Sequence, residues 1–553
     1  MSRRTLANVR SFDRTLSLLA VCFAIACSKS GAPPAGTVLV TAGTGTAAAP
    51  NAMMPSTPPQ TTPAAAGTAA PVGTQGSTPG NPSQGSAGSS STPSGGDVTV
   101  GGSGAPSGQA GTGATAQAGS SAPMTAPGAS EWKMIAYDET GSYNNIAEKK
   151  LTKENAGSLA IAWQIDMGGN VYGAPLQVGD KVYASSGSGV RALEPETGKQ
   201  IWSNPSGTSG SLAYDNGILY LYNARGTITA IDAQSGMQKW SKGPKGNPGG
   251  DGSSSPVIAG NMVFIGGSNG GAEIIGGRFR GFLAAMDKAT GEGIWTSFTV
   301  PDGASGASLW NSAAIDLSGG QAFAATGNNH GPPGTDSSDS LIGMDLMTGT
   351  IKWKNQRTMG DTWNGSAGTT DASPPDADFG ASPVFYQVMI GGQLTKVVSA
   401  GQKIGAAHAV KAADGMMLWT RQLCMGQNTR DGKMGIFVNG AWSGKNMLFA
   451  CNNAGKSTLF GIDGASGDVA WMTPLDGEVY GRISAANGVG FVGAGRALVV
   501  FDSDTGKILK TVPSKGGTVA GTITIANGHV AYGEGLTWAN GVAGRTLTML
   551  KVP

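Results

Sequence analysis

Apolar and polar residues alternate in short runs through the C-terminal three quarters of the chain, and a turn signal separates one run from the next. One recurring unit is a hairpin turn followed by an apolar strand that ends in small residues. Its eight copies begin at residues 178, 215, 259, 319, 391, 443, 486 and 526. Asn-Gly and Gly-Gly turns between such runs are typical of tight β-hairpins. The pattern therefore predicts many short antiparallel strands.

A second repeat places an acidic residue, a Gly four positions later and a Trp eight positions later. The copies are Glu194-Gly198-Trp202, Asp232-Gly236-Trp240, Asp287-Gly291-Trp295, Asp345-Gly349-Trp353 and Asp463-Gly467-Trp471, with degraded copies at Lys411-Gly415-Trp419 and Asp502-Gly506-Lys510. The carboxylate can bind its own backbone and the Gly can take positive φ, as a tight turn requires. The Trp on the next strand can then pack between neighbouring sheets. Repeats 38 to 66 residues apart predict an array of small sheets.

The two repeats differ in number, eight against seven, and the ends of the array explain the difference. Residues 546–550 form a last apolar strand with no Trp strand after it, whereas residues 159–163 end in Trp163 with no hairpin before them. If these two strands share one sheet, the array closes into a ring and leaves no unpaired edge. We therefore predict an all-β, eight-bladed β-propeller over residues 131–553, with Trp163 in a composite closing blade. An open solenoid is the alternative.

The segment before the array has a different composition. Residues 31–130 contain one charged residue, Asp97, and no aromatic residue, and consist mostly of Gly, Ala, Ser, Thr and Pro. Such a segment cannot bury enough apolar surface to offset its ordering entropy. We predict a disordered linker over residues 27–130, a tether with a root-mean-square reach of about 50–60 Å.

The N-terminus has the features of an export signal. Four arginines precede an apolar run at residues 16–26, which is too short to span a bilayer. The sequence Ala24-Ile25-Ala26-Cys27 resembles the lipobox of bacterial lipoproteins. The resemblance implies that residues 1–26 are a signal peptide, that Cys27 is acylated, and that the protein is an exported outer-membrane lipoprotein facing the periplasm or the cell surface. Ordinary signal-peptidase cleavage, giving a soluble periplasmic product, is the alternative.

Charge and cysteine usage narrow the function classes. The net charge is +2, and without residues 1–26 it is about −1, so the chain lacks the basic footprint of a nucleic-acid-binding protein. No phosphate loop, nucleophile elbow or Cys/His metal cluster is present, and no Cys-x-x-Cys-His motif, so covalent haem is not expected. Apart from Cys22 in the signal and Cys27, the remaining cysteines are Cys424 and Cys451, and in an oxidising compartment they are candidates for a disulfide.

Several segments resemble the PQQ (pyrroloquinoline quinone)-dependent alcohol dehydrogenases. They are Tyr137 to Trp163, Gly270-Gly271-Ala272-Glu273, Ser308-Leu309-Trp310, Ala325-Thr326-Gly327-Asn328 and Gln402-Lys403-Ile404-Gly405. Asp378-Phe379-Gly380-Ala381-Ser382-Pro383 looks closest to the polyvinyl-alcohol dehydrogenase branch. The resemblance spans residues 131–553.

The resemblance implies a cofactor site. Glu273 and Asn328 would supply oxygen ligands to Ca²⁺, a hard cation that acts as Lewis acid on the quinone. Trp310 would offer a flat face for stacking, and Lys403 would stabilise charge on the quinone oxygens. Ala272 and Ser253 would also contact the cofactor. For the general base there are two candidates, Asp336 and Asp339, and Asp336 is slightly favoured because it lies further from the predicted strand.

The implied function is oxidation of an alcohol, polymeric and secondary alcohols included, with electrons passed to an external cytochrome or quinone. Three departures from the family pattern put cofactor binding in doubt: Tyr172 replaces a glutamate, Tyr480 replaces a tryptophan, and the adjacent-cysteine ring is missing. The rival hypothesis is a non-catalytic propeller that resembles the lipoprotein scaffold of the outer-membrane β-barrel assembly machinery. In that case Trp310 would be blade packing, Glu273 and Lys403 would be solvated, and Asn328 would belong to a turn.

Overall fold

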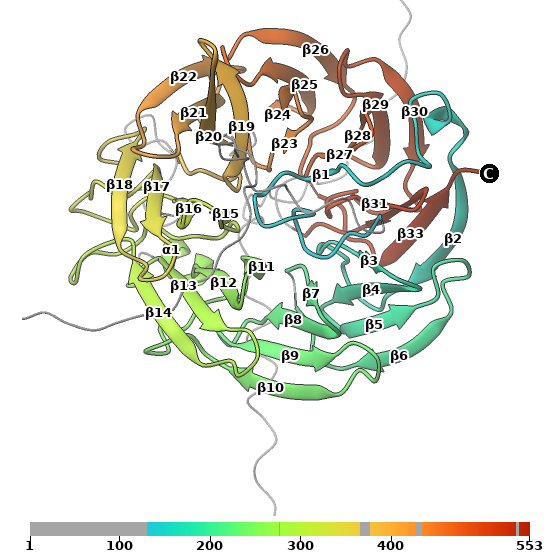
Figure 1. Ribbon diagram of the computed structural model, residues 1–553, viewed down its shortest axis with the longest axis horizontal. Coiled ribbons are helices and arrows are strands. Elements are labelled where there is room, and N and C mark those ends of the chain that lie inside the picture. Colours follow the sequence, from blue (N-terminus) through green and yellow to red (C-terminus); the bar gives the residue numbers. More distant parts are fainter. Residues whose placement is uncertain (1–129, 209, 276, 365–375, 427–433, 538–540) are drawn as a thin grey trace, which may run out of the picture. The chain divides into compact units, whose positions relative to one another are not determined.

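A computed structural model describes residues 130–208, 210–275, 277–364, 376–426, 434–537 and 541–553 of the chain. The predicted signal peptide, Cys27 and the predicted linker up to residue 129 lie outside these residues. Within them, eight sheets of similar strand order are arranged in a ring (Figure 1). The predicted eight-bladed β-propeller is therefore confirmed, and the open solenoid is excluded.

Each blade contains four antiparallel strands that follow one another from the inner to the outer side of the ring. Blade 1 contains β3 (Leu176–Val178), β4 (Lys181–Ser186), β5 (Gly189–Leu193) and β6 (Gln200–Asn204), and blade 2 contains β7 (Ala213–Asp215), β8 (Ile218–Tyr222), β9 (Ile228–Asp232) and β10 (Gln238–Lys242). Blade 3 contains β11 (Val257–Ala259), β12 (Met262–Gly267), β13 (Phe282–Asp287) and β14 (Gly293–Phe298), and blade 4 contains β15 (Ala314–Asp316), β16 (Gln321–Ala325), β17 (Ser340–Asp345) and β18 (Ile351–Gln356).

The remaining blades repeat this arrangement. Blade 5 contains β19 (Val384–Ile390), β20 (Gln393–Gly401), β21 (Ala406–Lys411) and β22 (Met417–Gln422), and blade 6 contains β23 (Ala441–Trp442), β24 (Asn446–Asn453), β25 (Lys456–Asp463) and β26 (Val469–Leu475). Blade 7 contains β27 (Ser484–Ala486), β28 (Val489–Ala494), β29 (Ala497–Asp502) and β30 (Ile508–Pro513), with β1 (Asn144–Asn145) added inside β27. Blade 8 contains β31 (Thr524–Ala526), β32 (His529–Gly533), β33 (Thr546–Lys551) and β2 (Ala160–Asp166).

This strand order sorts the loops between the two faces of the ring. The hairpins that join first to second strands, and the tight turns that join third to fourth strands, lie at one face because the strands alternate in direction. The loops between second and third strands lie at the opposite face, together with the connections from each blade to the next. We call this opposite face the loop face. Every predicted site residue from Ser253 to Lys403 lies on one of its loops or connections.

The acidic-Gly-Trp repeat joins each blade to the next, as the sequence predicted. At one copy the Asp287 carboxylate accepts the backbone N–H groups of Ala289 and Thr290 at 3.0 and 2.8 Å. Gly291 has a φ of +74°, and a Cβ there would lie 2.7 Å from Cε3 of Trp240 in the preceding blade. The indole therefore packs directly on the turn of its neighbour.

The ring closes through the predicted composite blade. β2 pairs with β33 in antiparallel register, with Trp163 opposite Met549. The Nε1–H of Trp163 donates to the carbonyl of Pro195 in blade 1 at 2.7 Å, so this junction uses the same Trp contact as the others. At blade 7 the Trp position is Lys510, whose ammonium group donates to the carbonyl of Gly157 in the 3₁₀ helix η1 (Ala156–Ser158) at 2.8 Å.

The segment before β2 lines the inside of the ring, which the sequence did not predict. Residues 132–145 contact the second residue of seven inner strands, through backbone or side-chain hydrogen bonds to Gln177, Tyr214, Ile315, Phe385, Trp442, Ala485 and Ile525. Trp132 and Tyr143 of this segment are fully buried. Its path across the inner strands is visible at the centre of Figure 1. Residues 132–145 therefore fill the channel at the level of the inner strands.

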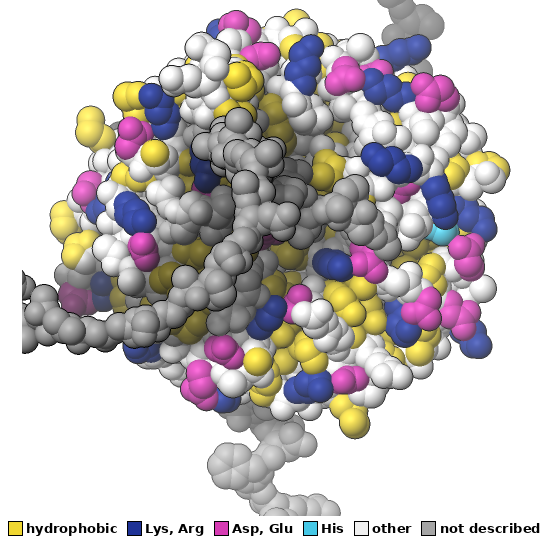
Figure 2. Space-filling view, in the orientation of Figure 1, with side chains coloured by type: hydrophobic (Ala, Val, Ile, Leu, Met, Phe, Trp, Pro, Cys, Tyr) yellow, Lys and Arg dark blue, Asp and Glu magenta, His cyan; other side chains and the backbone are white. Residues whose placement is uncertain are grey.

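Basic and acidic side chains are interspersed over the surface shown in Figure 2, without a large patch of one sign. Among the described residues, no helix has the length and apolar character that a membrane crossing requires.

Candidate functional site

The mouth of the channel is lined by equivalent residues of successive blades. The residue four positions before each inner strand forms this layer, which we call the mouth layer: Tyr172, Ser253, Trp310, Gly380, Phe437, Tyr480 and Ala520. Trp310 is only half-buried in this layer. A Cβ at Gly380 would lie 3.0 Å from Cη2 of Trp310, so the indole lies against the backbone of the next blade. The indole is thus fixed in place and still accessible.

Lys403 is held above this indole. It lies in the loop between β20 and β21, and its Nζ is 2.7 Å from a carboxylate oxygen of Asp376 and 2.7 Å from one of Asp378. The same Nζ is 5.4 Å from the ring centroid of Trp310. Burial alone would lower the pKa of Lys403, but the charges of Asp376 and Asp378 outweigh it and raise the pKa, so the side chain stays protonated. The side chain is 11% exposed, which contradicts the reading of Lys403 as a solvated strand-end lysine.

Asp378 also fixes the backbone of Asn328. Its second carboxylate oxygen accepts the backbone N–H of Asn328 at 2.6 Å. The side-chain amide nitrogen of Asn328 donates to the carbonyls of Asn329 and Trp363. Because both amide hydrogens are engaged on that side, the amide oxygen is turned the other way. It is therefore available as a ligand oxygen.

Glu273 reaches the same group of charges from blade 3. It lies in α1 (Gly270–Ile274), a single turn whose N-cap, Asn269, accepts the backbone N–H of Ala272 at 3.0 Å. Burial, and next the charge of Asp378, raise the pKa of Glu273 to about 8, while Lys403 opposes this shift. Because the charges of Asp378 and Lys403 both act on this carboxyl, we group Glu273 with the cluster around Lys403.

The two candidate bases lie in different surroundings. The side chain of Asp336 is 75% exposed and pairs with Lys354 at 2.7 Å, which lowers its pKa. Asp339 is fully buried at a φ of +49°, and neither of its carboxylate oxygens has a hydrogen-bond partner in the described part of the chain. Burial, and then the charges of Asp361 and Asp378, raise its pKa well above the ordinary value. The structure therefore brings Asp339 to the cluster and leaves Asp336 at the surface.

Two members of the cluster were missed by the sequence reading, Asp361 and Asp376. Both come from the connection between blades 4 and 5. Asp361 is buried and accepts the backbone N–H groups of Trp363 and Ala377 at 2.9 and 3.0 Å, which ties the two ends of this connection together. Burial raises its pKa to about 7 despite these bonds. Four aspartates on one connection, Asp361, Asp371, Asp376 and Asp378, in a chain with only 13% charged residues, were a signal that could have been read.

The cluster as a whole suits a cation. It gathers five carboxylates, of Glu273, Asp339, Asp361, Asp376 and Asp378, around one lysine. Such an excess of buried negative charge raises carboxyl pKa values unless a cation neutralises it. Among the described residues, no group of three or more His, Cys, Asp and Glu side chains is arranged so that it could hold a metal ion by itself. A cation would therefore use fewer carboxylates, with the Asn328 amide oxygen and oxygens of a bound ligand completing its shell.

The two other predicted contacts, Ala272 and Ser253, have plainer surroundings. Ala272 is partly exposed beside Glu273. Ser253 is exposed in the mouth layer, and its backbone N–H donates to the carboxylate of Asp251 at 3.1 Å. Both lie at the loop face, but no side-chain bond holds either one toward Trp310.

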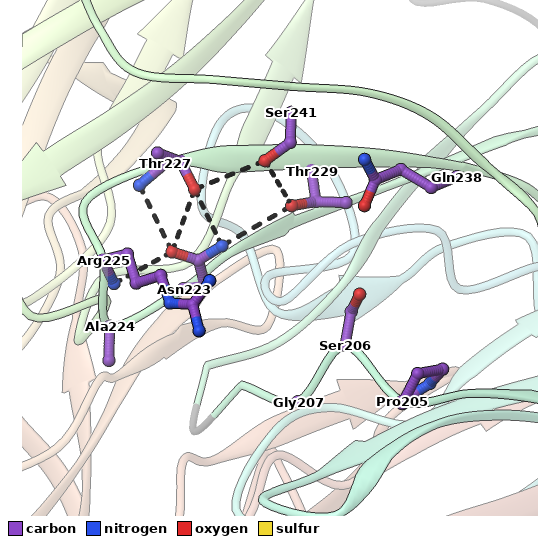
Figure 3. Close-up of a pocket in the computed structure, with 10 residues that line it drawn as sticks. All are labelled: Pro205, Ser206, Gly207, Asn223, Ala224, Arg225, Thr227, Thr229, Gln238 and Ser241. Atoms are coloured by element: carbon purple, nitrogen blue, oxygen red, sulfur yellow. Dashed lines mark hydrogen bonds between the residues drawn. The ribbon is translucent and has the colours of Figure 1, made fainter. Parts of the chain in front are cut away.

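Two further features lie apart from the cluster. A polar cavity of about 380 Å³ opens between blades 1 and 2, where Asn223 bonds Thr227, and Thr229 shares a hydrogen bond with Ser241 (Figure 3). None of the predicted site residues lines it. A disulfide joins Cys424 to Cys451 and so attaches the connection after blade 5 to β24.

Known proteins share both the repeat and the fold. The family model PQQ_2, described as "Outer membrane protein assembly factor BamB", matches residues 113–355 and 403–547. A polyvinylalcohol dehydrogenase of Pseudomonas sp is 25% identical over 455 residues, which cover 71% of this chain and 69% of that protein. One from Sphingopyxis sp. (strain 113P3) is 25% identical, with 68% of this chain and 65% of that protein covered. The matches thus span about two thirds of the length of these relatives.

The solved structures agree on the fold. The quinohemoprotein alcohol dehydrogenase of Comamonas testosteroni superposes with a TM-score of 0.64 at 18% identity, covering 76% of this chain and 80% of that one. The family resemblance predicted from the motifs is confirmed. The chain belongs to the PQQ_2 family of β-propeller proteins and, within it, is similar to the PQQ-dependent alcohol dehydrogenases.

Proposed function

We propose that this protein oxidises alcohols with PQQ as cofactor and Ca²⁺ as Lewis acid, and passes the electrons to an external cytochrome or quinone. The observation that carries the proposal is the position of Lys403. Its side chain is 11% exposed, its ammonium group pairs with two aspartates, and it lies 5.4 Å from the ring centroid of a half-buried indole. Burying these charged groups costs folding free energy. A propeller that served only as a scaffold would have no use for this lysine.

The residues present fit the cofactor and its metal. The accessible face of Trp310 suits a planar aromatic ligand. Glu273 and Asn328 supply the carboxylate and amide oxygens that Ca²⁺ prefers. When bound, PQQ supplies the quinone carbonyl that accepts hydride from an alcohol carbon, and Ca²⁺ polarises that carbonyl.

Each protein group has a definite role in this arrangement. Lys403 donates hydrogen bonds at the oxygens where negative charge develops, and Asp376 and Asp378 hold its ammonium group in place. Asp339 takes the hydroxyl proton of the alcohol on a carboxylate oxygen. Its raised pKa would impede this role in the metal-free protein, but a divalent cation beside it favours the ionised form.

The polyvinylalcohol dehydrogenases among the relatives support a polymeric or secondary alcohol as substrate. A site at the open loop face, with all of its groups on connections and loops, is compatible with a long chain passing over it. We further propose that the protein is exported and anchored to the outer membrane through Cys27, with residues 27–130 as tether. The support for this is the signal-like N-terminal sequence.

The rival hypothesis is the non-catalytic scaffold, in line with the assembly factor after which the matching family is described. Reconstitution distinguishes the two. The full-length protein is incubated with PQQ and Ca²⁺, and dye-linked oxidation of primary, secondary and polymeric alcohols is measured. We expect dye reduction that requires PQQ, Ca²⁺ and an alcohol. It should be lost in Lys403→Ala but kept in Lys445→Ala, which changes an exposed lysine in the hairpin between β23 and β24, on the opposite face. If PQQ neither binds nor supports dye reduction, the enzyme hypothesis fails and the scaffold hypothesis replaces it.

A further inference from the structure

A belt of hydrogen bonds runs around the channel just below the mouth layer. It is made by the residue two positions before each inner strand, whose backbone N–H donates to the side chain at the equivalent position of the next blade. The bonds are Ala174 N to Ser211 Oγ at 2.8 Å, Ser211 N to Ser255 Oγ at 2.9 Å, Ser255 N to Ser312 Oγ at 3.1 Å, Ser312 N to Ser382 Oγ at 2.9 Å and Ser382 N to Asn439 Oδ1 at 2.8 Å. The belt thus joins blades 1 to 6.

The belt stops at blades 7 and 8, where the equivalent residues are Arg482 and Thr522. The two connections lie against each other at Gly481 and Gly521, which precede these residues. A Cβ at Gly481 would be 3.3 Å from the carbonyl oxygen of Gly521. Even so, Oγ1 of Thr522 has no hydrogen-bond partner, and neither has Nε of Arg482 nor Oγ of Ser484, although all three atoms are buried. Thr522 and Ser484 are fully buried, so the half-buried Arg482 is the one of these three residues that a ligand in the channel can reach.

Arg482 is the cation of this sector. Its guanidinium carbon is 5.3 Å from the ring centroid of Tyr172, and among the described residues it makes no ion pair. Tyr172 and Arg482 are both half-buried, whereas Tyr143 is fully buried. Burial raises the pKa of Tyr143, and the charge of the nearby Arg482 opposes that rise. The open side of the guanidinium therefore faces the mouth of the channel.

This sector lies across the channel from the acidic cluster. Glu273, Asp339 and Lys403 belong to blades 3, 4 and 5, whereas Arg482 and Tyr172 lie at blades 7 and 1 of the same eight-membered ring. Tyr172 and Trp310 are equivalent residues of different blades and lie at the same depth in the mouth layer. A flat ligand on the indole of Trp310 would therefore extend toward the guanidinium of Arg482. Lys403 lies on the acidic side of the channel, where Asp376 and Asp378 both pair with its ammonium group.

We propose that Arg482 anchors a carboxylate of the planar ligand that stacks on Trp310. The inference rests on the proposed function, because PQQ is a tricarboxylate. A guanidinium fork matches a carboxylate with two parallel hydrogen bonds, and the face of Tyr172 orients it beforehand. The anchor also offsets the repulsion between an anionic ligand and the surplus of carboxylates on the other side of the channel.

The test is a titration of the full-length protein with PQQ in Ca²⁺, followed by quenching of tryptophan fluorescence at low and high salt. Arg482→Gln is compared with Arg496→Gln, which removes the same charge from an exposed arginine of the same blade. We expect Arg482→Gln to raise the Kd for PQQ at least ~10-fold and to flatten its salt dependence, since the lost contact joins two charged groups. Arg496→Gln should match the wild type.

Three outcomes separate the hypotheses. If Arg482→Gln binds PQQ within about threefold of the wild type, the anchor is wrong while the proposed function stands. If Arg482→Gln loses both affinity for PQQ and melting temperature, Arg482→Lys distinguishes the two explanations. Partial recovery of affinity supports a charge contact, whereas no recovery means a packing role and overturns the anchor. If the wild type itself does not bind PQQ, the proposed function fails and the anchor fails with it.

Discussion

The carboxylate of Asp378 accepts a hydrogen bond from the ammonium group of Lys403 at 2.7 Å. The other oxygen of the same carboxylate accepts the backbone N–H of Asn328, so one side chain positions both a cation and a candidate metal ligand. The metal-ligand loop of blade 4 and the lysine loop of blade 5 are therefore joined through a residue on the connection between those blades.

Asp378→Asn tests this link. The amide can still accept from Asn328 but carries no charge for Lys403, so we expect turnover to fall at least ~10-fold with a smaller change in PQQ affinity. The double change Asp376→Asn with Asp378→Asn leaves a buried lysine unpaired and should cost about 3–5 kcal/mol of unfolding free energy. Kinetics and denaturant melts check the two effects. Full turnover in Asp378→Asn would contradict the positioning role.

We expect the buried carboxylate of Asp339 to lower the stability of the metal-free protein at neutral pH. Its folded-state pKa lies above the unfolded value, so the unfolded chain loses its proton first as the pH rises, and the folded state is increasingly penalised above about pH 4. Asp339→Asn removes the penalty, and the metal-free variant should be more stable than the wild type at pH 7 to 8, with the difference vanishing near pH 4.

The same change should abolish turnover, because the proton acceptor is gone. Asp336→Asn, at the exposed carboxylate three residues earlier, is the matched control and should alter neither property. Thermal melts from pH 4 to 8 and dye-linked assays give the answer. An Asp339→Asn enzyme with wild-type turnover would return the base to Asp336 or to another group.

Ca²⁺ binding should depend on pH. Burial holds the pKa of Glu273 at about 8 and that of Asp361 at about 7 in the metal-free protein, so these carboxyls carry protons that a bound cation must displace. We expect the affinity for Ca²⁺ to rise from pH 6 to pH 8 and binding to release protons. Calorimetry in two buffers of different ionisation enthalpy measures that release. An affinity that does not vary with pH would show that the metal binds elsewhere.

The turns were the part of the fold that could be predicted from residues alone. A carboxylate, a Gly and a Trp at fixed spacing specify a local geometry, and Asp287, Gly291 and Trp295 adopt it. Closure of the ring followed from counting, because Trp163 had no sheet of its own. The plug formed by residues 132–145 did not follow, since its contacts lie on seven different blades and leave no local pattern.

The site was predicted in part for a related reason. Trp310, Glu273, Asn328 and Lys403 were found through short motifs that a family shares. Asp361 and Asp376 belong to a long connection without periodicity, and only the folded chain brings them to Lys403. Asp336 is exposed and Asp339 is buried, and the burial of a loop residue cannot be inferred from its distance to a strand.

The Trp-on-turn contact has a stability consequence that a matched pair of glycines isolates. Gly291 and Gly320 both have positive φ, +74° and +63°, but a Cβ at Gly320 meets open space whereas one at Gly291 meets the indole of Trp240. We expect Gly320→Ala to cost about 1 kcal/mol and Gly291→Ala roughly 2–4 kcal/mol of unfolding free energy. Equal costs in denaturant melts would show that the indole yields and that the backbone conformation is the whole effect.

The most direct test of the account is equilibrium binding of PQQ to the purified full-length protein, with and without Ca²⁺, followed by fluorescence and absorbance. The account predicts saturable binding at micromolar concentration or tighter that requires Ca²⁺ and is lost in both Trp310→Ala and Glu273→Gln, while the far-ultraviolet spectrum of a β-protein is unchanged. Binding that is undetectable in the wild type, or that survives in both variants, would contradict the assignment of this site.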